Sequence, residues 1–156
     1  MKRLNILLLA FFLLLTTNVQ AAETTAETTI TASAEQGNAL AQAQLGALYL
    51  LGKEGKDQDD IKAAQWMLKA ANQGVLEAEV IMAAMYDRGL GIPQDVPKAT
   101  AWYEKAAAQG HKPSLAILGR NEVAKGGVAF DYKRMRLSAA KQIPNEYAKQ
   151  ILKKKL

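Results

Sequence analysis

The chain has 156 residues, of which 49% are hydrophobic, so it is long enough to bury the core of one domain. It contains no cysteine, which excludes disulfide bonds and a lipid attached through cysteine. Its apolar residues are mainly Ala and Leu, with only three Phe, and this composition favours helices over a sheet. We therefore expect an all-α protein.

The net charge of +5 is the sum of two opposed ends. Residues 23–110 hold 7 Lys or Arg against 12 Asp or Glu, whereas residues 111–156 hold 11 against 3. The basic pI therefore does not indicate a nucleic-acid-binding protein. The basic tail also lacks the interleaved aromatic residues on which bases stack.

Residues 1–21 have the features of a signal peptide. Two basic residues precede an apolar run from 4 to 15, and the small residues Val19 and Ala21 stand where a signal peptidase reads the chain. An uncleaved membrane anchor is the alternative, but the run is shorter than the roughly 20 apolar residues that span a bilayer. We expect cleavage after Ala21 and a soluble periplasmic protein that is not a lipoprotein.

Residues 22–33 are small and polar without periodicity, which predicts a flexible leader before an ordered domain that begins near Ala34. Beyond it, the sequence WMLKAANQG at 66–74 returns as WYEKAAAQG at 102–110. Other residues recur at the same offset of 36 or 37, including Tyr49 with Tyr86. This predicts helical repeats at about 34–73, 74–109 and 110–144.

The third repeat is degenerate. Leu118 and Gly119 take the places of Leu45 and Gly46, but Ser138 replaces the tryptophan. Terminal repeats are expected to be atypical because one of their faces has no neighbouring repeat.

Each repeat divides into two helices. In the second repeat, RGLGIPQD at 88–95 interrupts the helical period, and Asp95 is placed to cap the next helix with Pro97 in its first turn. Helices of roughly 12 to 15 residues are marginal alone in water, so the pairs must stack. The residues that recur and that we expect to build the stack are Gly46, Tyr49, Trp66, Gly74, Tyr86, Trp102 and Gly110.

This pattern resembles the Sel-one-like repeat family, which is related to the tetratricopeptide repeat. The resemblance lies in QLGALYLLGKEG, DIKAAQW and KAANQG in the first repeat, and in MYDRGLGIPQD and PKATAWYEKAAAQG in the second. It covers about residues 34–142, with Ala83 where the family prefers glycine. It implies a right-handed α-α superhelix that acts as a protein-binding scaffold.

Pro144 and Asn145 interrupt the pattern again, and residues 145–156 are predicted to form a separate basic helix that caps the open end of the stack. Its lysines are favourable at a helix C-terminus. The alternative is a basic contact for an acidic partner or an anionic membrane, which we favour less.

No catalytic, cofactor-binding or metal site is expected. His111 is the single histidine, and it follows the glycine that closes the second repeat, where a cap or turn residue explains it. Ser114 is better read as part of a helix start than as a nucleophile. The glycine pairs lie in loops between helices and lack the features of a nucleotide-binding loop.

A protein-binding surface remains as the functional candidate. In stacked helix pairs, the first helices commonly line a concave groove where other proteins bind. Residues there that differ between repeats are candidates for recognition, although ordinary core positions are an equal alternative for Ile81, Met85 and Ile117. The candidate groove residues are Gln44, Leu48, Ile81, Met85, Arg88, Ile117, Arg120 and Asn121.

We expect a monomeric, non-enzymatic adaptor that binds another protein. An immunity protein that neutralises a toxin delivered into the periplasm is a second hypothesis, motivated by the signal segment, the small size and the lack of catalytic groups. An enzyme that acts on the cell wall or on a β-lactam is a third, with little in the sequence to support it.

Overall fold

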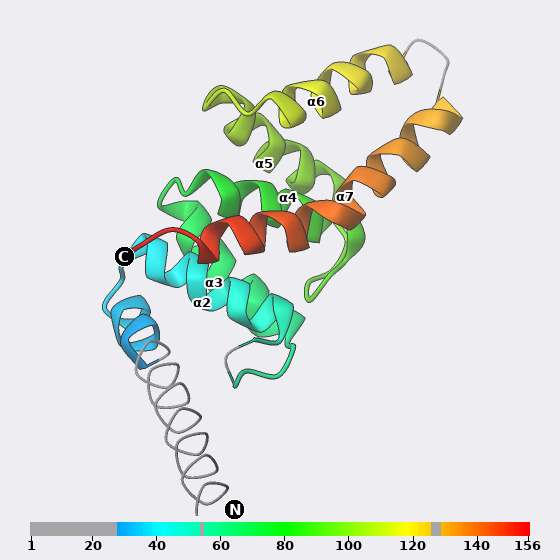
Figure 1. The fold of residues 1–156 in the computed structure, drawn as a ribbon. Coiled ribbons are helices and arrows are strands. Elements are labelled where there is room, and N and C mark those ends of the chain that lie inside the picture. The colour runs from blue at the N-terminus through cyan, green and yellow to red at the C-terminus, as the bar shows by residue number, and fades with distance from the viewer. Residues whose placement is uncertain (1–27, 54, 126–128) are drawn as a thin grey trace, which may run out of the picture.

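The structure, a computed structural model, describes residues 28–53, 55–125 and 129–156, with side chains described outside 120–137 and 139. The expected signal peptide at residues 1–21 lies outside these ranges. Every regular element within them is an α-helix, which confirms the all-α fold (Figure 1). The helices are α2 (Ala39–Leu51), α3 (Asp60–Asn72), α4 (Leu76–Arg88), α5 (Val96–Ala108), α6 (Lys112–Lys125) and α7 (Ala129–Leu152).

The first two repeats, α2–α3 and α4–α5, turn between their helices in the same way. Asp59 and Asp95 each cap the second helix by accepting a backbone N–H three residues on, from Lys62 and Lys98. Each aspartate also donates its own backbone N–H to the tyrosine carbonyl near the end of the first helix. The N-cap predicted at Asp95 is thus confirmed, with Pro97 in the first turn of α5.

Each of these two repeats is closed at its other end by a glutamine. Gln73 donates from Nε2 to the carbonyl of Gly37 at 3.1 Å and to Oε1 of Gln42 at 2.7 Å. Gln109 makes the equivalent bonds one repeat later, to the carbonyl of Gly74 and to Glu79 Oε2. The glutamine in the duplicated sequence therefore ties the end of the second helix to the start of the first.

The duplicated tryptophan and lysine also form one structural unit. Lys69 Nζ lies 3.8 Å from the ring centroid of Trp66, and Lys105 Nζ lies 3.9 Å from that of Trp102. These are cation–π contacts between residues three apart on one helix. Trp102 is buried in the main core, whereas Trp66 is half-buried at the N-terminal end of the stack.

The ordered part begins earlier than expected. Residues 28–35 are helical, although the flexible leader was predicted to continue to residue 33. Ala34 is fully buried with Ala41 and Leu45, and Ile30 and Trp66 pack against this cluster. The segment is ordered because it covers apolar surface that the first repeat leaves at its open end.

The third repeat does not close as the first two do. A Cβ added at Gly46 in α2 would lie 3.0 Å from Met67 Cγ, so α2 and α3 pack closely. At the equivalent Gly119 in α6, an added Cβ would meet no atom of the described residues within 4 Å. Figure 1 shows α6 and α7 diverging, and α7 packs mainly on α4 and α2.

The separate capping helix expected at residues 145–156 is absent. α7 continues through Pro144, which is fully buried, and ends at Leu152. A proline removes one helical hydrogen bond, here to the carbonyl of Ala140, and bends a helix. The bend of α7 is visible in Figure 1, and we attribute the continued helix to the burial of this segment against the repeats.

Candidate functional site

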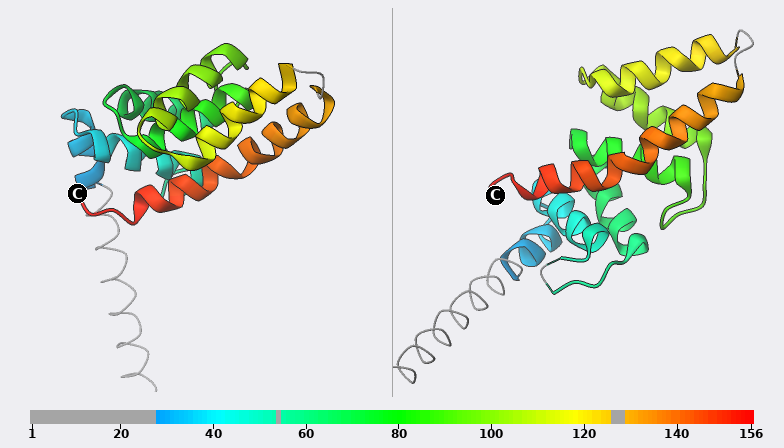
Figure 2. Two further views of the ribbon diagram at one scale, coloured as in Figure 1. Left: turned by 90° about the horizontal axis from the view of Figure 1, so that it is seen from above. Right: turned by 45° about the vertical axis from the view of Figure 1, so that its right-hand side comes forward.

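α7 packs against α2 and α4, the two helices that contain the central residues of the candidate groove, and we call the side of α2 and α4 that it covers the α2–α4 face. Gln44 and Leu48 lie in α2, and Ile81 and Met85 lie in α4; all four are buried. α7 runs back across both helices toward the N-terminal end of the repeats (Figure 2). In this structure the chain's own C-terminal helix therefore occupies the position that was expected to receive a partner.

The remaining candidate residues lie elsewhere. Ile117 in α6 is 6% exposed and belongs to the main core. Arg88 is exposed at the end of α4. Arg120 and Asn121 lie in α6, but their side chains are outside the described part of the structure. The sequence left open whether Ile81, Met85 and Ile117 are groove residues or core residues, and in the structure all three belong to the core.

The burial of α2 and α4 shows that both helices are covered on more than one side. In α4 every residue from Ala78 to Met85 is buried, and α2 shows a similar uninterrupted stretch from Ala41 to Leu48. A helix that keeps one side in solvent shows a buried stripe, as α3 does where it packs on α2 and α4. α2 and α4 are covered on one side by their partner helices and on the other by α7.

From Ala140 onward, the side chains of α7 that are buried against the repeats are mainly apolar and follow helical spacing. Ala140, Ile143, Ala148 and Ile151 are all buried in the main core. On the opposite side of the helix, Lys141, Gln142, Asn145, Glu146, Lys149 and Gln150 are exposed. The C-terminal half of α7 is thus an amphipathic helix whose apolar side docks on the α2–α4 face.

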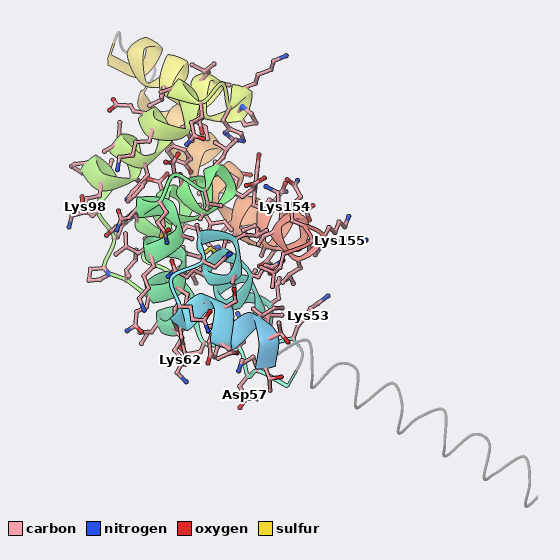
Figure 3. All side chains as sticks on the ribbon, turned by 90° about the vertical axis from the view of Figure 1, so that its left-hand side faces the viewer. Lys53, Asp57, Lys62, Lys98, Lys154 and Lys155 are labelled. Carbon is pink, nitrogen blue, oxygen red and sulfur yellow. The ribbon has the colours of Figure 1, made fainter. Side chains whose placement is uncertain are left out.

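Polar contacts hold the end of this helix. Lys154 Nζ lies 2.7 Å from Glu77 Oε1 in the first turn of α4. Gln44 donates from Nε2 to the carbonyl of Lys154, also at 2.7 Å, while its Oε1 is buried without a hydrogen-bond partner. Figure 3 shows Lys154 and Lys155 on the α7 side of the molecule and Lys98 on the other side.

His111 connects the start of α6 to α7. Its Nδ1 accepts the backbone N–H of Ser114 at 3.2 Å and lies 2.7 Å from the Ser114 hydroxyl oxygen. Because Nδ1 accepts, the neutral ring carries its proton on Nε2 and donates it to the Tyr147 hydroxyl. The capping role that was expected for His111 is therefore confirmed.

The surroundings of His111 shift two pKa values. Burial lowers the pKa of His111, and the negative charge of Glu77 opposes this shift. Burial, together with the charge of Glu77, raises the pKa of Tyr147. Both shifts favour the neutral forms, so near neutral pH this contact between α6 and α7 is an uncharged hydrogen bond.

These groups are not arranged as a catalytic site. Ser114 is completely buried, so its hydroxyl has no access to a substrate although it lies beside an imidazole. Among the described residues, no group of three or more His, Asp or Glu side chains is placed to hold a metal ion. Within the same residues, none of the helices has the length and apolar character to cross a membrane. The contact between α7 and the α2–α4 face is therefore the candidate functional site.

Sequence reasoning did not identify Glu77, Tyr147 and Lys154 as members of one contact. A signal for a cover over the first helices is present, because α2 has no charged residue and α4 contains the unbroken apolar run from Val80 to Met85. A helix that is apolar all round is buried all round. The opposite net charges of residues 23–110 and 111–156 also favour contact between the repeats and the C-terminal segment.

Comparisons with known proteins agree with the repeat pattern. A family model described as Sel1 repeat matches residues 39–75 and 76–111, which are the α2–α3 and α4–α5 pairs. A crystal structure of a Sel1 repeat protein from Oxalobacter formigenes is similar with a TM-score of 0.56 and 43% sequence identity, over 58% of this chain and 26% of that one.

Two curated proteins share the same region. Chitin synthase regulator SKT5 from Saccharomyces cerevisiae is 36% identical over 100 residues, which are 64% of this chain and 14% of the yeast protein. DAP3-binding cell death enhancer 1 from Rattus norvegicus is 33% identical over 82 residues, 53% of this chain and 16% of the rat protein. The chain thus spans less than a fifth of the length of these relatives.

Proposed function

This chain is a Sel1 repeat protein, and on that premise we propose that it is an exported, non-enzymatic adaptor that binds another protein through its first helices. The observation that carries the proposal is the α2–α4 face, which already holds an amphipathic helix across the first helices of the repeats, where helical repeat proteins commonly bind their partners. The names of the two relatives, a regulator of chitin synthase and a DAP3-binding protein, also describe action on another protein.

Photo-cross-linking tests where a partner binds. We would place a photoreactive amino acid at Arg88, a candidate groove residue that is exposed in the last turn of α4, and as a matched control at Lys98, which is exposed on the side of the molecule away from α7 (Figure 3). We expect one protein of the cell envelope to cross-link to position 88 and not to position 98. Equal cross-linking at both positions would contradict binding at this face.

Export is the second part of the proposal, supported by the basic start, apolar run and small residues of positions 1–21. Intact-mass measurement of the protein from the periplasmic fraction should give a chain that begins at Ala22. Recovery of the full-length chain from the cytoplasm alone would contradict export. The alternative, a toxin-neutralising immunity protein, predicts instead that deletion of the gene sensitises the cell to the toxin.

A further inference from the structure

The C-terminal half of α7 and the four residues after it, which we define as residues 140–156 and call the docked segment, have the form of a helical ligand. Its buried side chains lie on one side, and its other side is polar and exposed. Recognition of an amphipathic helix by an apolar surface between helices uses this arrangement of anchors. The α2–α4 face is therefore a surface suited to a helix, whichever chain supplies it.

The fit of the docked segment to this face is incomplete. Gln44 is 4% exposed, and its Oε1 has no hydrogen-bond partner even though α7 is docked. A buried acceptor without a donor costs free energy, and a ligand that brings a donor to this atom removes the cost. Pro144 also leaves one carbonyl of α7 without its helical hydrogen bond. Another helix could satisfy this face better than the docked segment does.

Charge defines what kind of helix fits. The polar anchor of the docked segment is Lys154, which pairs with Glu77 of α4. Residues 23–110, which include the repeats that form this face, carry five more acidic than basic residues. Electrostatic attraction therefore favours a basic helix over an acidic one at this end of the face.

The ion pair is accessible enough to break. The Lys154 side chain is 46% exposed and that of Glu77 is 16% exposed, so water reaches the pair from one side. A partly exposed pair gives specificity while contributing little to stability. The end of the docked segment thus has a contact that a competing lysine or arginine can replace.

We propose that the α2–α4 face is the binding site for a basic amphipathic helix of the partner protein, and that the docked segment is an internal ligand which this helix displaces. The inference rests on the proposed adaptor function and adds the chemistry of the partner. A tethered segment competes at high effective concentration, so the partner binds more weakly than it would to a free face.

A peptide of residues 140–156 with a fluorescent label is the probe, and fluorescence anisotropy with the full chain is the measurement. We expect saturable binding that is lost when the peptide carries Ile143→Asp and Ile151→Asp, because these are the buried anchors. No binding of the unmodified peptide to any form of the chain would overturn the proposal.

Two single substitutions in the full chain separate displacement from general charge effects. Lys154→Gln weakens the docked segment through the lost Glu77 contact and should raise peptide affinity about fivefold, the value of a roughly 1 kcal/mol ion pair. Lys149→Gln removes the same charge, but Lys149 bonds only Glu146 of its own helix among the contacts described, so affinity should not change. Equal effects of the two would overturn the proposal.

Because the chain lacks cysteine, the docked segment can be locked in place. In Glu77→Cys/Lys154→Cys, a short bis-maleimide linker joins α4 to the docked segment, and the same protein before linking is its own control. Linking should abolish peptide binding. Undiminished peptide binding after linking would overturn the proposal. If the linked protein also captured its partner protein, the proposed adaptor function would hold, but displacement of the docked segment would not be part of it.

Hydrogen exchange and light scattering cover the remaining alternatives. Amides of the docked segment should exchange faster than those of α4 if the segment opens by itself. If the amides of the docked segment and of α4 exchange only at the same rate, in one common opening, α7 is a fixed part of the core and the proposal is overturned.

Light scattering tests whether a second copy of the chain binds the face. Dimers that become more abundant in Lys154→Gln would assign the α2–α4 face to a second copy of the chain and overturn the proposal of a partner helix.

Discussion

Trp66 and Trp102 occupy equivalent positions and carry equivalent lysines, but they do not have equivalent neighbours. Trp102 is 8% exposed within the main core, whereas Trp66 is half-buried against the small cluster around Ala34. The sequence predicts one role for both, and the structure shows that the end of the stack changes the burial of one. Two residues at equivalent positions of the repeat are therefore expected to contribute differently to the stability of the fold.

This difference predicts unequal effects of truncation. Trp102→Ala should lower the free energy of unfolding by about 3–5 kcal/mol, because it leaves a large cavity in the core. Trp66→Ala should lower it by clearly less, since part of that ring already contacts water. Urea unfolding followed by circular dichroism measures both, and an equal loss would show that the N-terminal cluster is as tightly packed as the core.

His111 gives a prediction about pH. Its pKa in the folded protein lies below the usual 6.5, so between that lowered value and 6.5 the unfolded chain binds more protons than the folded chain. The contribution of neutral His111 is complete above pH 6.5 and is lost as the pH falls through its folded pKa. Because the chain has a single histidine, its ring resonance in an NMR titration should report a midpoint below 6.5 without overlap.

His111→Asn is the matched control, since Asn38 caps α2 at the equivalent position by accepting the N–H of Ala41. The variant should keep a cap on α6 and lose this part of the pH dependence of stability. A pH dependence unchanged from that of the original protein would place its origin elsewhere.

Among the helices and their connections, one loop within a repeat and one loop between repeats show how neighbouring units are held together. Gly91, in the loop after α4, has a φ of +68°, and a Cβ there would overlap the carbonyl of Asp60 at the start of α3. Gly74, between α3 and α4, has a φ of +83° with nothing within 4 Å of an added Cβ. The first glycine is required by both conformation and contact, the second by conformation alone.

Alanine at these two glycines should therefore separate the two requirements. Gly74→Ala should cost about 1–2 kcal/mol for the left-handed conformation. Gly91→Ala should cost more than this, because the backbone of one repeat must also move away from the other. Thermal unfolding of both variants measures the difference, and equal losses would show that the contact with Asp60 relaxes freely.

At the scale of the whole molecule, α7 closes the repeats into one body. It is the only described helix that packs on both α2 and α4 from the side opposite their partner helices, so it replaces the neighbours that a longer stack would provide. Covering the apolar α2–α4 face in this way removes a surface through which two copies would associate.

A monomer is the expected result. Size-exclusion chromatography with light scattering should give the mass of one chain over a wide range of concentration. A mass that rises toward two chains on concentration would indicate that the cover is incomplete or is exchanged between copies.

The local structure of the repeats can be read from the amino-acid sequence alone. The period of 36 or 37 residues, the aspartate caps, the glycine stops and the helix pairs all follow from contacts between residues near one another in the chain, and such contacts are readable as spacing. The same reasoning correctly assigned His111 to a helix cap.

The path of α7 and the covering of the candidate groove, in contrast, depend on contacts between distant parts of the chain. Pro144 and Asn145 are local signals for the end of a helix, but burial of Pro144 and its neighbours against α2 and α4 outweighs them. Gln44 and Lys154 are 110 residues apart, and no periodicity relates them. The sum of many long-range apolar contacts, which local spacing does not encode, placed the chain's own helix where a partner was expected.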